Sequence, residues 1–272
     1  MPGDDPAGSA PVARASGVGH RFGGTTALAG VDLELLRGRI TALVGANGSG
    51  KTTLLRILAG ILEPSDGEVE VLGIARPARS GRRTRRALRR RASYVSQEPA
   101  LDPEMTGGEI LALAATLYGV RRPCRRRRVT ELAATFGVGS HLARRVSTWS
   151  GGLRRRLHLA AGMIHDPELL LLDEPTAGLD PEGRRLLWVD LEARAKRGRS
   201  VAIVTHDLAA AERHAGTVVI LDRGALVAAG SPVELCALDG GTASDLIDLE
   251  GSFRRLTGRD VAELLPRGRG EP

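Results

Sequence analysis

Residues 40–60 read ITALVGANGSGKTTLLRILAG, and this stretch decides the fold. The first five residues predict a buried strand, and the last nine predict a helix over residues 52–59 that ends at Gly60. The loop between them fits the pattern GxxxxGK[ST], in which glycines let backbone N–H groups close around phosphates at the positive end of the next helix. In this strand–loop–helix context, the pattern predicts a phosphate-binding site and not an unliganded glycine-rich turn.

The loop also offers two side chains suited to phosphate chemistry. Lys51 would place a positive charge on the β- and γ-phosphates of a nucleotide, and the hydroxyl of Thr52 would be a ligand for Mg²⁺. The residues expected to contact the nucleotide are Gly45, Ala46, Asn47, Gly48, Ser49, Gly50, Lys51, Thr52 and Thr53.

A second motif, LLLLDEP at residues 169–175, delivers two adjacent acids to the end of an apolar strand. Ligand sites of parallel sheets lie at the carboxyl ends of strands. We therefore expect Asp173 to hold Mg²⁺, directly or through water, and Glu174 to polarise a water in line with the γ-phosphate. Two solvated turn acids are the alternative, which the buried strand before them disfavours.

Strand and helix patterns alternate along the chain, as in a parallel α/β core. Predicted strands lie at residues 31–35, 39–44, 68–72, 169–172, 200–205, 218–221 and 225–229. The last two surround residues 222–224, which read DRG and give a hairpin signal. No internal repeat is visible, so one such core is expected and not two.

Residues 98–165 interrupt this alternation with a helical pattern. Thr106 and Glu109 have the spacing of a capping box, which predicts a helix start. An apolar stripe is expected behind the cap, formed by Ile110, Leu111, Leu113, Ala114 and Leu117.

Composition excludes several classes of protein. The chain of 272 residues has 42% hydrophobic and 26% charged residues, as ordinary globular proteins do, and lacks a run of about 20 apolar residues that would span a bilayer. Residues 1–11, MPGDDPAGSAP, are expected to be a disordered lead-in and not a secretory signal. Cys124 and Cys236 are too few for a disulfide framework, which favours a reducing cytoplasm.

The basic charge comes from arginine. Of 39 basic residues only Lys51 and Lys196 are lysines, and arginines concentrate in residues 82–91 and 121–128. A solvated face is the favoured interpretation; attraction to an anionic membrane surface or to nucleic acid are the alternatives. Few aromatic residues are present to stack on bases, so no nucleic-acid partner is expected.

The stretch Ser150-Gly151-Gly152, followed by LLLLDEPTAGLD at residues 169–180, resembles the ATP-binding cassette (ABC) ATPases. The resemblance covers about residues 12–235. It implies that two cassettes pack head to tail and that this Ser-Gly-Gly caps the ATP held by the partner. The residues agree, because a serine and two free backbone N–H groups at a helix start form an anion site. Ser150 also fits an ordinary N-cap, and the two roles are compatible.

Further positions are assigned by the resemblance alone. It implies that Gln97 touches magnesium or water, that His206 contacts the γ-phosphate, and that Asp180 lies in the loop at the cassette interface. Asp180 also suits an N-cap before Pro181. Phe22 stands where the family places an aromatic ring against adenine, although a single Phe near a strand end is more often core. Catalytic roles are thus expected for Glu174, His206 and Gln97, and magnesium ligation for Thr52, Gln97 and Asp173.

Two positions depart from the usual family signature: Trp149 stands for a leucine and Leu153 for a glutamine. Neither removes the Ser-Gly-Gly, so activity is expected to persist. An aromatic before the signature, RRRL after it, and LEGSFRRLTGRD at residues 249–260 look like the branch that exports drugs, lipids and polysaccharides.

The resemblance therefore predicts an α/β fold with a P-loop NTPase (RecA-like) core, a small antiparallel β subdomain and an inserted α-helical subdomain. Expected domains are a disordered terminus at 1–11, the ATPase at 12–235 with its helical insertion at about 98–165, and a short tail at 236–272. The implied function is ATP hydrolysis with Mg²⁺, coupled to export through separate membrane permease subunits at the cytoplasmic face of the cell membrane. A second cassette, expected to be a copy of this chain, completes the site. A soluble ABC ATPase acting on nucleic acid or ribosomes and a non-catalytic cassette are the alternatives.

Overall fold

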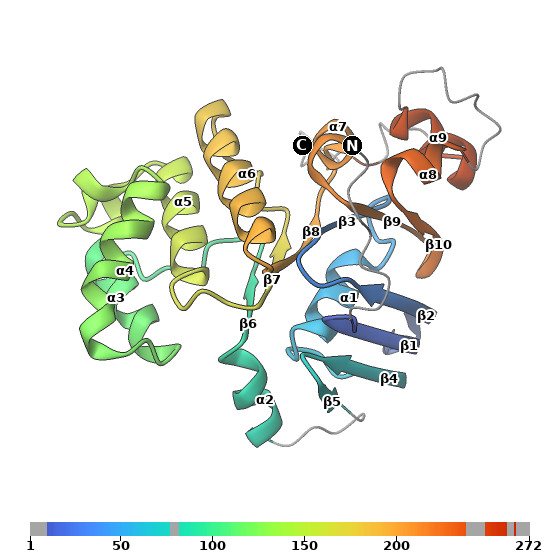
Figure 1. The fold of residues 1–272 in the computed structure, drawn as a ribbon, viewed down its shortest axis with the longest axis horizontal. Helices are drawn as coiled ribbons and strands as arrows, with labels where there is room; N and C mark the ends of the chain where they lie inside the picture. The colour runs from blue at the N-terminus through green and yellow to red at the C-terminus, as the bar shows by residue number, and fades with distance from the viewer. Residues whose placement is uncertain (1–9, 77–81, 238–247, 260–263, 265–272) are drawn as a thin grey trace.

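Two β-sheets and a lobe of helices make up the computed structural model, which describes residues 10–76, 82–237, 248–259 and 264 (Figure 1). The first sheet is antiparallel, in the order β2-β1-β4-β5. Its strands are β1 (Ala13–Phe22), β2 (Thr25–Leu35), β4 (Asp66–Val71) and β5 (Ile74–Arg76). It supplies the antiparallel subdomain that the sequence predicted, although β2 begins six residues earlier than expected.

The second sheet has the order β10-β9-β3-β8-β7-β6, and its pairs are parallel except for β9 with β10. Its strands are β3 (Ile40–Val44), β6 (Ala92–Val95), β7 (Leu169–Asp173), β8 (Ser200–Val204), β9 (Thr217–Asp222) and β10 (Ala225–Gly230). Every residue of β3, β7 and β8 is buried, as expected of parallel strands covered on both faces. The expected hairpin joins β9 to β10.

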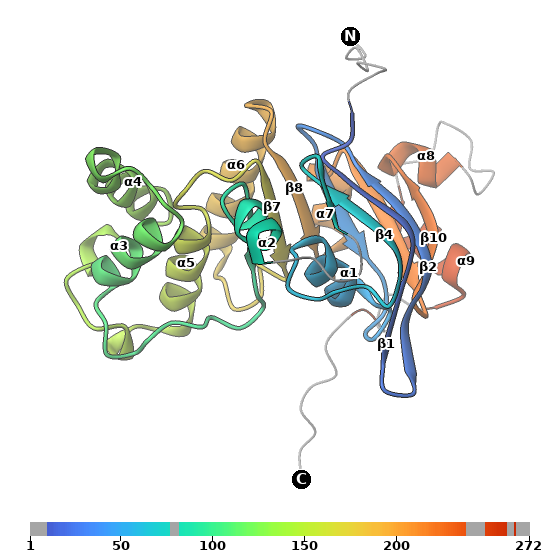
Figure 2. The ribbon, with the colours of Figure 1, turned by 90° about the horizontal axis from the view of Figure 1, so that it is seen from below.

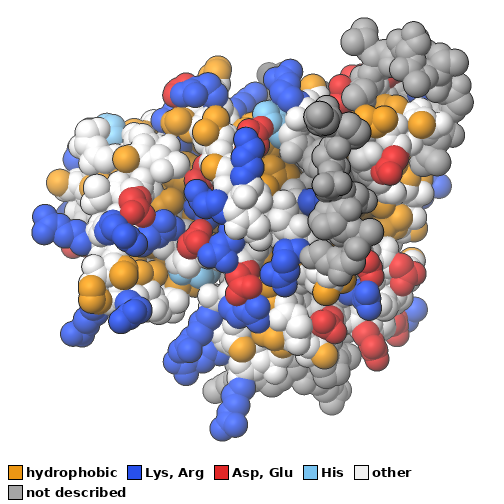
Figure 3. All heavy atoms as spheres, in the orientation of Figure 1, with side chains coloured by type: hydrophobic (Ala, Val, Ile, Leu, Met, Phe, Trp, Pro, Cys, Tyr) orange, Lys and Arg blue, Asp and Glu red, His pale blue; other side chains and the backbone are white. Residues whose placement is uncertain are grey.

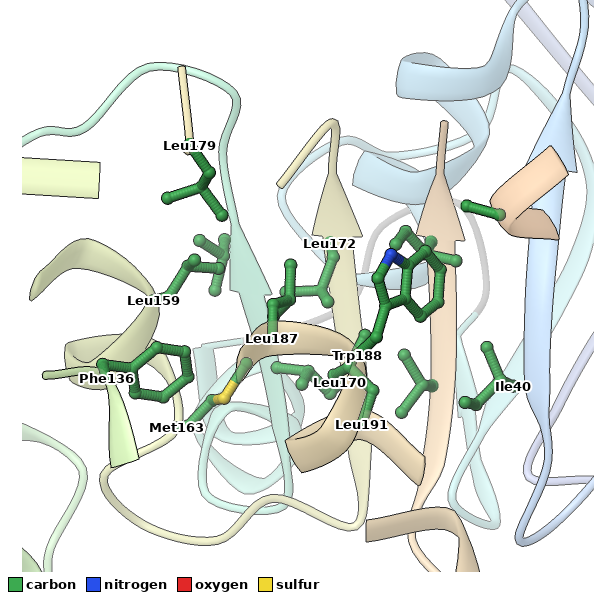
Figure 4. Close-up of a cluster of buried hydrophobic side chains, with 14 of the residues drawn as sticks. Ile40, Phe136, Leu159, Met163, Leu170, Leu172, Leu179, Leu187, Trp188 and Leu191 are labelled. Atoms are coloured by element: carbon green, nitrogen blue, oxygen red, sulfur yellow. The ribbon is translucent and has the colours of Figure 1, made fainter. Parts of the chain in front are cut away.

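Alternating residues of this sheet feed two separate cores, because successive strand side chains point to opposite faces. Leu170 and Leu172 pack with Leu187, Trp188 and Leu191 of helix α6 (Pro181–Lys196), as Figure 4 shows. The leucines that point to the other face, Leu169 and Leu171, pack with helix α1 (Lys51–Leu58) and with the antiparallel sheet. Helix α1 is therefore fixed between the two sheets, and a short loop joins the end of β3 to its first residue.

A lobe of helices lies beside the large sheet, between β6 and β7 in sequence (Figure 2). It contains α3 (Gly107–Leu117), α4 (Arg122–Thr135) and α5 (Gly151–Gly162). The capping box at Thr106 is present. The expected stripe is wrong in two members, because Leu113 is 46% exposed and Leu117 is 75% exposed, whereas Ala115 is buried. Residues 113 and 117 lie across the helix from 111 and 115, so they cannot share one buried face.

The remaining helices are α2 (Arg82–Arg89), α7 (Leu208–His214), α8 (Pro232–Ala237) and α9 (Leu249–Thr257). The two arginine runs lie on α2 and at the start of α4, and basic side chains gather over this region in Figure 3. Most of the described members are solvent-exposed, as a solvated face requires. The expected lead-in and part of the expected tail fall outside the described residues. In the part of the chain that is described, no helix combines the length and apolar character needed to cross a membrane.

Helix α5 approaches β6 most closely at Gly162, where an added Cβ would lie 2.4 Å from Cγ2 of Val95. Overpacking outweighs the helix propensity that alanine gains, so we expect Gly162→Ala to lower the free energy of unfolding by about 1–2 kcal/mol in urea titrations. Val95→Ala in the same chain should recover part of this loss, since it removes the clashing methyl. Gly139→Ala, which meets nothing closer than 4.0 Å, is the control. Equal stability of Gly162→Ala and wild type would contradict the close contact.

Candidate functional site

The loop after β3 has a backbone path that only glycine allows at two points. Gly45 has φ of 152°, and an added Cβ would lie 2.1 Å from the carbonyl oxygen of Leu221. Gly50 has φ of 101°, and its Cβ would lie 2.6 Å from the carbonyl oxygen of Ala27. These clashes with fixed backbone explain why glycine occupies both positions, and they fix the curved path that leads into α1.

Lys51 is the first residue of α1 and is only 5% exposed. Its ammonium group donates to the carbonyl oxygens of Gly45 (2.6 Å) and Ala46 (2.9 Å) inside the loop. Burial lowers the pKa of Lys51 to about 8, although Glu174 and Asp173 act in the opposite direction. The cation is therefore poorly solvated and aimed at the space that the loop surrounds, where an anion would stabilise its charged form.

Asp173 lies at the end of β7 and is held by two hydroxyl groups. Thr52 Oγ1 donates to one carboxylate oxygen (3.0 Å), and Tyr94 Oη donates to the other (3.0 Å). Arg56 in turn donates to Tyr94 Oη (3.3 Å). The sequence placed Thr52 and Asp173 at one site, and the structure brings them into direct contact.

Glu174 follows in the left-handed region, with φ of 46°, which is costly for a residue with a side chain. Its backbone N–H donates to Val204 of the neighbouring strand (3.0 Å), which holds this turn in place. The Glu174 carboxylate is in contact with Nε2 of His206, and both side chains are largely buried. The strained turn thus aims the acid across the strand ends toward the histidine.

A cavity of about 320 Å³ joins these groups. Its lining residues come from β2, from the loop and the start of α1, and from the residues that follow β6, β7 and β8. They are Ala27, Asn47, Gly48, Ser49, Gly50, Lys51, Thr52, Thr53, Gln97, Glu174 and His206. Segments more than 150 residues apart in sequence therefore meet around one space, and Gly45, Ala46 and Asp173 contact its lining residues.

Several expected site residues do not line this cavity. Ser150 is the N-cap of α5 and accepts from the backbone N–H of Leu153 (3.3 Å), with Gly151 and Gly152 as the first helical residues. Asp180 is the N-cap of α6, where it accepts from Gly183 and is paired with Arg156.

Phe22 and Trp149 have other surroundings. Phe22 is 51% exposed at the end of β1, with its ring edge-on to His20. Trp149 is buried, its indole N–H donates to the carbonyl of Arg144 (3.3 Å), and its ring fills the space beside Gly107. The tryptophan is therefore part of the packing between α3 and the start of α5, which explains how it substitutes for leucine.

Three residues at the site escaped the sequence analysis: Ala27, which lines the cavity from β2, and two residues that hold groups of the site in place. Tyr94, which holds Asp173, lies in β6, a strand that the sequence did not predict, and nothing in the local pattern signals that contact. Arg155 is buried and donates to backbone carbonyls on both sides of the site, including those of Gln97 and Glu174. Nothing in RRR at residues 154–156 distinguishes it from its two neighbours.

The oxygen groups near Asp173 suit a hard divalent cation. The Thr52 hydroxyl and the Asp173 carboxylate touch each other, and Gln97 brings an amide to the same cavity. Among the described residues no cluster of three or more His, Cys, Asp or Glu side chains is suited to a metal. A cation here would therefore complete its shell with ligand oxygens and water, as Mg²⁺ does in nucleotide sites.

Comparisons with known proteins agree with this geometry. The family described as "ABC transporter" matches residues 28–177. The daunorubicin resistance ATP-binding protein DrrA3 of Streptomyces coeruleorubidus is 39% identical over 85% of this chain and 72% of its own length. The Nod factor export ATP-binding protein I of Ralstonia nicotianae is 34% identical over 90% of this chain and 74% of its own. A solved ATP-binding subunit of an ABC transporter superposes with a TM-score of 0.82 at 27% identity, covering 90% of this chain and 99% of the other.

The lowered pKa of Lys51 predicts how ATP affinity depends on pH. Bound triphosphate favours the ammonium form, so above pH 8 binding must take up a proton, and the dissociation constant should rise by up to about tenfold per pH unit. Titration calorimetry between pH 7 and 9.5, in buffers of different ionisation enthalpy, measures both the affinity and the proton uptake.

The second lysine provides a matched control for that titration. Lys196→Met should retain the dependence, because Lys196 ends α6 and does not line the cavity, whereas Lys51→Met should bind weakly and lose the dependence. A wild-type affinity that stays constant across this range would show that Lys51 does not titrate on binding.

Proposed function

Because this chain belongs to the ATP-binding cassette transporter family, we propose that its ATP hydrolysis drives export through membrane-spanning subunits that are separate chains. The chain is an ATP-binding subunit with the ATPase activity of that family. The observation that carries the proposal is the single cavity shared by Lys51, Glu174 and His206. A phosphate-binding loop and a water-positioning acid in one cavity are groups that hydrolysis of a γ-phosphate uses, and here a histidine lies beside the acid.

The roles of the residues follow from their positions. Lys51 and the loop N–H groups bind the phosphates, while Thr52, Asp173 and Gln97 would hold Mg²⁺, which neutralises charge on the β- and γ-phosphates. Glu174 accepts a proton from the attacking water and orients it. His206 positions the Glu174 carboxylate through the contact between its Nε2 and that carboxylate, and it faces the γ-phosphate from the end of the strand next to β7.

The nucleotide site requires a second cassette. Ser150, Gly151 and Gly152 present a helix N-terminus that does not line the cavity of their own chain. A partner cassette in head-to-tail arrangement would apply its own three residues to the ATP held here. Two copies of this chain suffice for that arrangement, and Asp180 would lie at the same interface.

Export is supported by the names of the relatives. One is named for daunorubicin resistance and another for Nod factor export, and both are ATP-binding proteins of which this chain covers 72% and 74%. We place the chain at the cytoplasmic face of the cell membrane, held there by permease subunits, with the cargo chosen by those subunits.

Blocking hydrolysis without blocking binding tests this mechanism. Glu174→Gln should lower kcat by about 100-fold or more, because the amide cannot accept the proton, and should trap an ATP-dependent dimer in size-exclusion chromatography with light scattering. Adding Ser150→Arg should abolish the trapped dimer. Glu182→Gln, at an exposed acid of α6, is the control with wild-type behaviour. A Glu174→Gln protein that binds ATP yet stays monomeric would overturn the head-to-tail site.

The partner is tested by affinity purification from gently solubilised membranes. A multi-spanning membrane protein should be recovered with wild type and with Glu174→Gln. Recovery of ribosomes or nucleic acid without any membrane protein would contradict the transport function. It would make the exposed arginines of α2 and α4 the functional surface, through salt-sensitive phosphate contacts.

A further inference from the structure

Arg155 lies on the second turn of α5 and is 2% exposed, which is unusual for arginine. Its guanidinium donates to five backbone carbonyl oxygens in two segments of the chain. The acceptors are Ser96 (2.7 Å), Gln97 (2.6 Å), Asp173 (3.2 Å), Glu174 (2.8 Å) and Pro175 (3.2 Å).

In the part of the chain that the structure describes, no carboxylate shares these hydrogen bonds. A buried charge needs compensation, and here the compensation comes from converging carbonyl dipoles together with the charges of Asp173 and Glu174. Burial lowers the pKa of Arg155 to about 10, so the group remains a cation at neutral pH. The planar guanidinium presents donors in several directions at once, which a lysine ammonium at the same point could not match.

The two segments that Arg155 joins carry two of the proposed catalytic groups. Strands β6 and β7 are parallel neighbours, and the residues that follow them, Gln97 and Glu174, both line the nucleotide cavity. The joining side chain comes from the helix that begins at Ser150. One guanidinium therefore connects the helix that would cap the partner's ATP to both loops at the chain's own ATP.

Its neighbours have different surroundings. Arg156 pairs with Asp180 at the start of α6, and Arg154 is exposed. Because Arg154 and Arg155 are adjacent on one helix, substitution of Arg154 is a matched control for helix propensity and net charge.

We propose that Arg155 is a positioning residue, which holds the Gln97 and Glu174 loops in one relative arrangement and couples them to the movement of α5. The proposal rests on the function proposed above and adds a regulatory connection to it. When the partner's nucleotide engages the N-terminus of α5, this helix shifts, and Arg155 transmits the shift to the hydrolytic groups. Arg155 itself contacts no reacting atom.

Hydrogen–deuterium exchange without nucleotide tests the positioning directly and does not depend on activity. In Arg155→Lys and Arg155→Met, backbone amides of residues 96–98 and 176–178 should exchange about tenfold faster or more, because these loops lose their shared anchor. Rates within α3 should stay at the wild-type value, and Arg154→Met should match wild type throughout. Unchanged exchange in both loops, or equal acceleration everywhere, would overturn the proposal.

Steady-state kinetics supply a second readout. Arg155→Lys should lower kcat by about 10- to 100-fold, while affinity for ATP without magnesium changes by less than about threefold, since misplaced catalytic groups impair the transition state more than binding. The Mg²⁺ concentration for half-maximal activity should also rise, because Gln97 is displaced. A purely structural role predicts a lower Tm with unchanged kcat per folded molecule and unchanged Mg²⁺ dependence.

The wild-type reaction separates the two proposals. A wild-type protein that binds ATP but does not hydrolyse it would refute the proposed mechanism, and the exchange experiment would still decide whether Arg155 anchors the two loops. A wild-type protein that hydrolyses ATP, with Arg155 variants that match it in kcat and in exchange, would refute the positioning role alone.

Discussion

The site depends on the parallel register of the large sheet. Leu43 of β3 and Asp173 of β7 both pair with Val204 of β8, so the residues that follow these strands emerge at one edge. Parallel strands can share such an edge because each crossover returns the chain to the opposite end of the sheet. The register thus brings the phosphate loop, Glu174, His206 and Gln97 to one edge of the sheet, where contacts such as that of Thr52 with Asp173 hold them further. A shift of one residue in β7 would turn the buried leucines to the wrong faces and move both acids.

The sequence predicted the parts of the site that have a local signature. Glycines at fixed spacing between an apolar strand and a helix, and two acids at the end of another strand, each identify their own position. The extent of α3's buried face was harder to predict, because Leu113 and Leu117 satisfy an apolar pattern while facing solvent.

Tyr94 and Arg155 could not be found in the same way, because their roles come from tertiary contacts. Tyr94 reaches Asp173 only because β6 lies next to β7, and Arg155 is buried only because α5 crosses the ends of both strands. Periodicity offers no means of selecting one arginine from three in succession. The positions of Ser150 and Asp180 as helix caps were foreseeable, whereas their relation to a partner's ATP is a matter of assembly that one chain does not contain.

The contacts of Lys51 also limit which amino acids can replace it at this position. Arginine has taken nearly every basic position in the chain, which is what a strong mutational bias toward its codons would produce. Lys51 is one of the two exceptions, and its ammonium donates to two carbonyl oxygens of the loop at 2.6 and 2.9 Å, an arrangement that suits a compact point charge better than a planar guanidinium. Rarity alone does not identify a functional lysine, because Lys196 is equally rare and lies at the end of α6 outside the cavity; the close fit of Lys51 to the loop is what distinguishes the two.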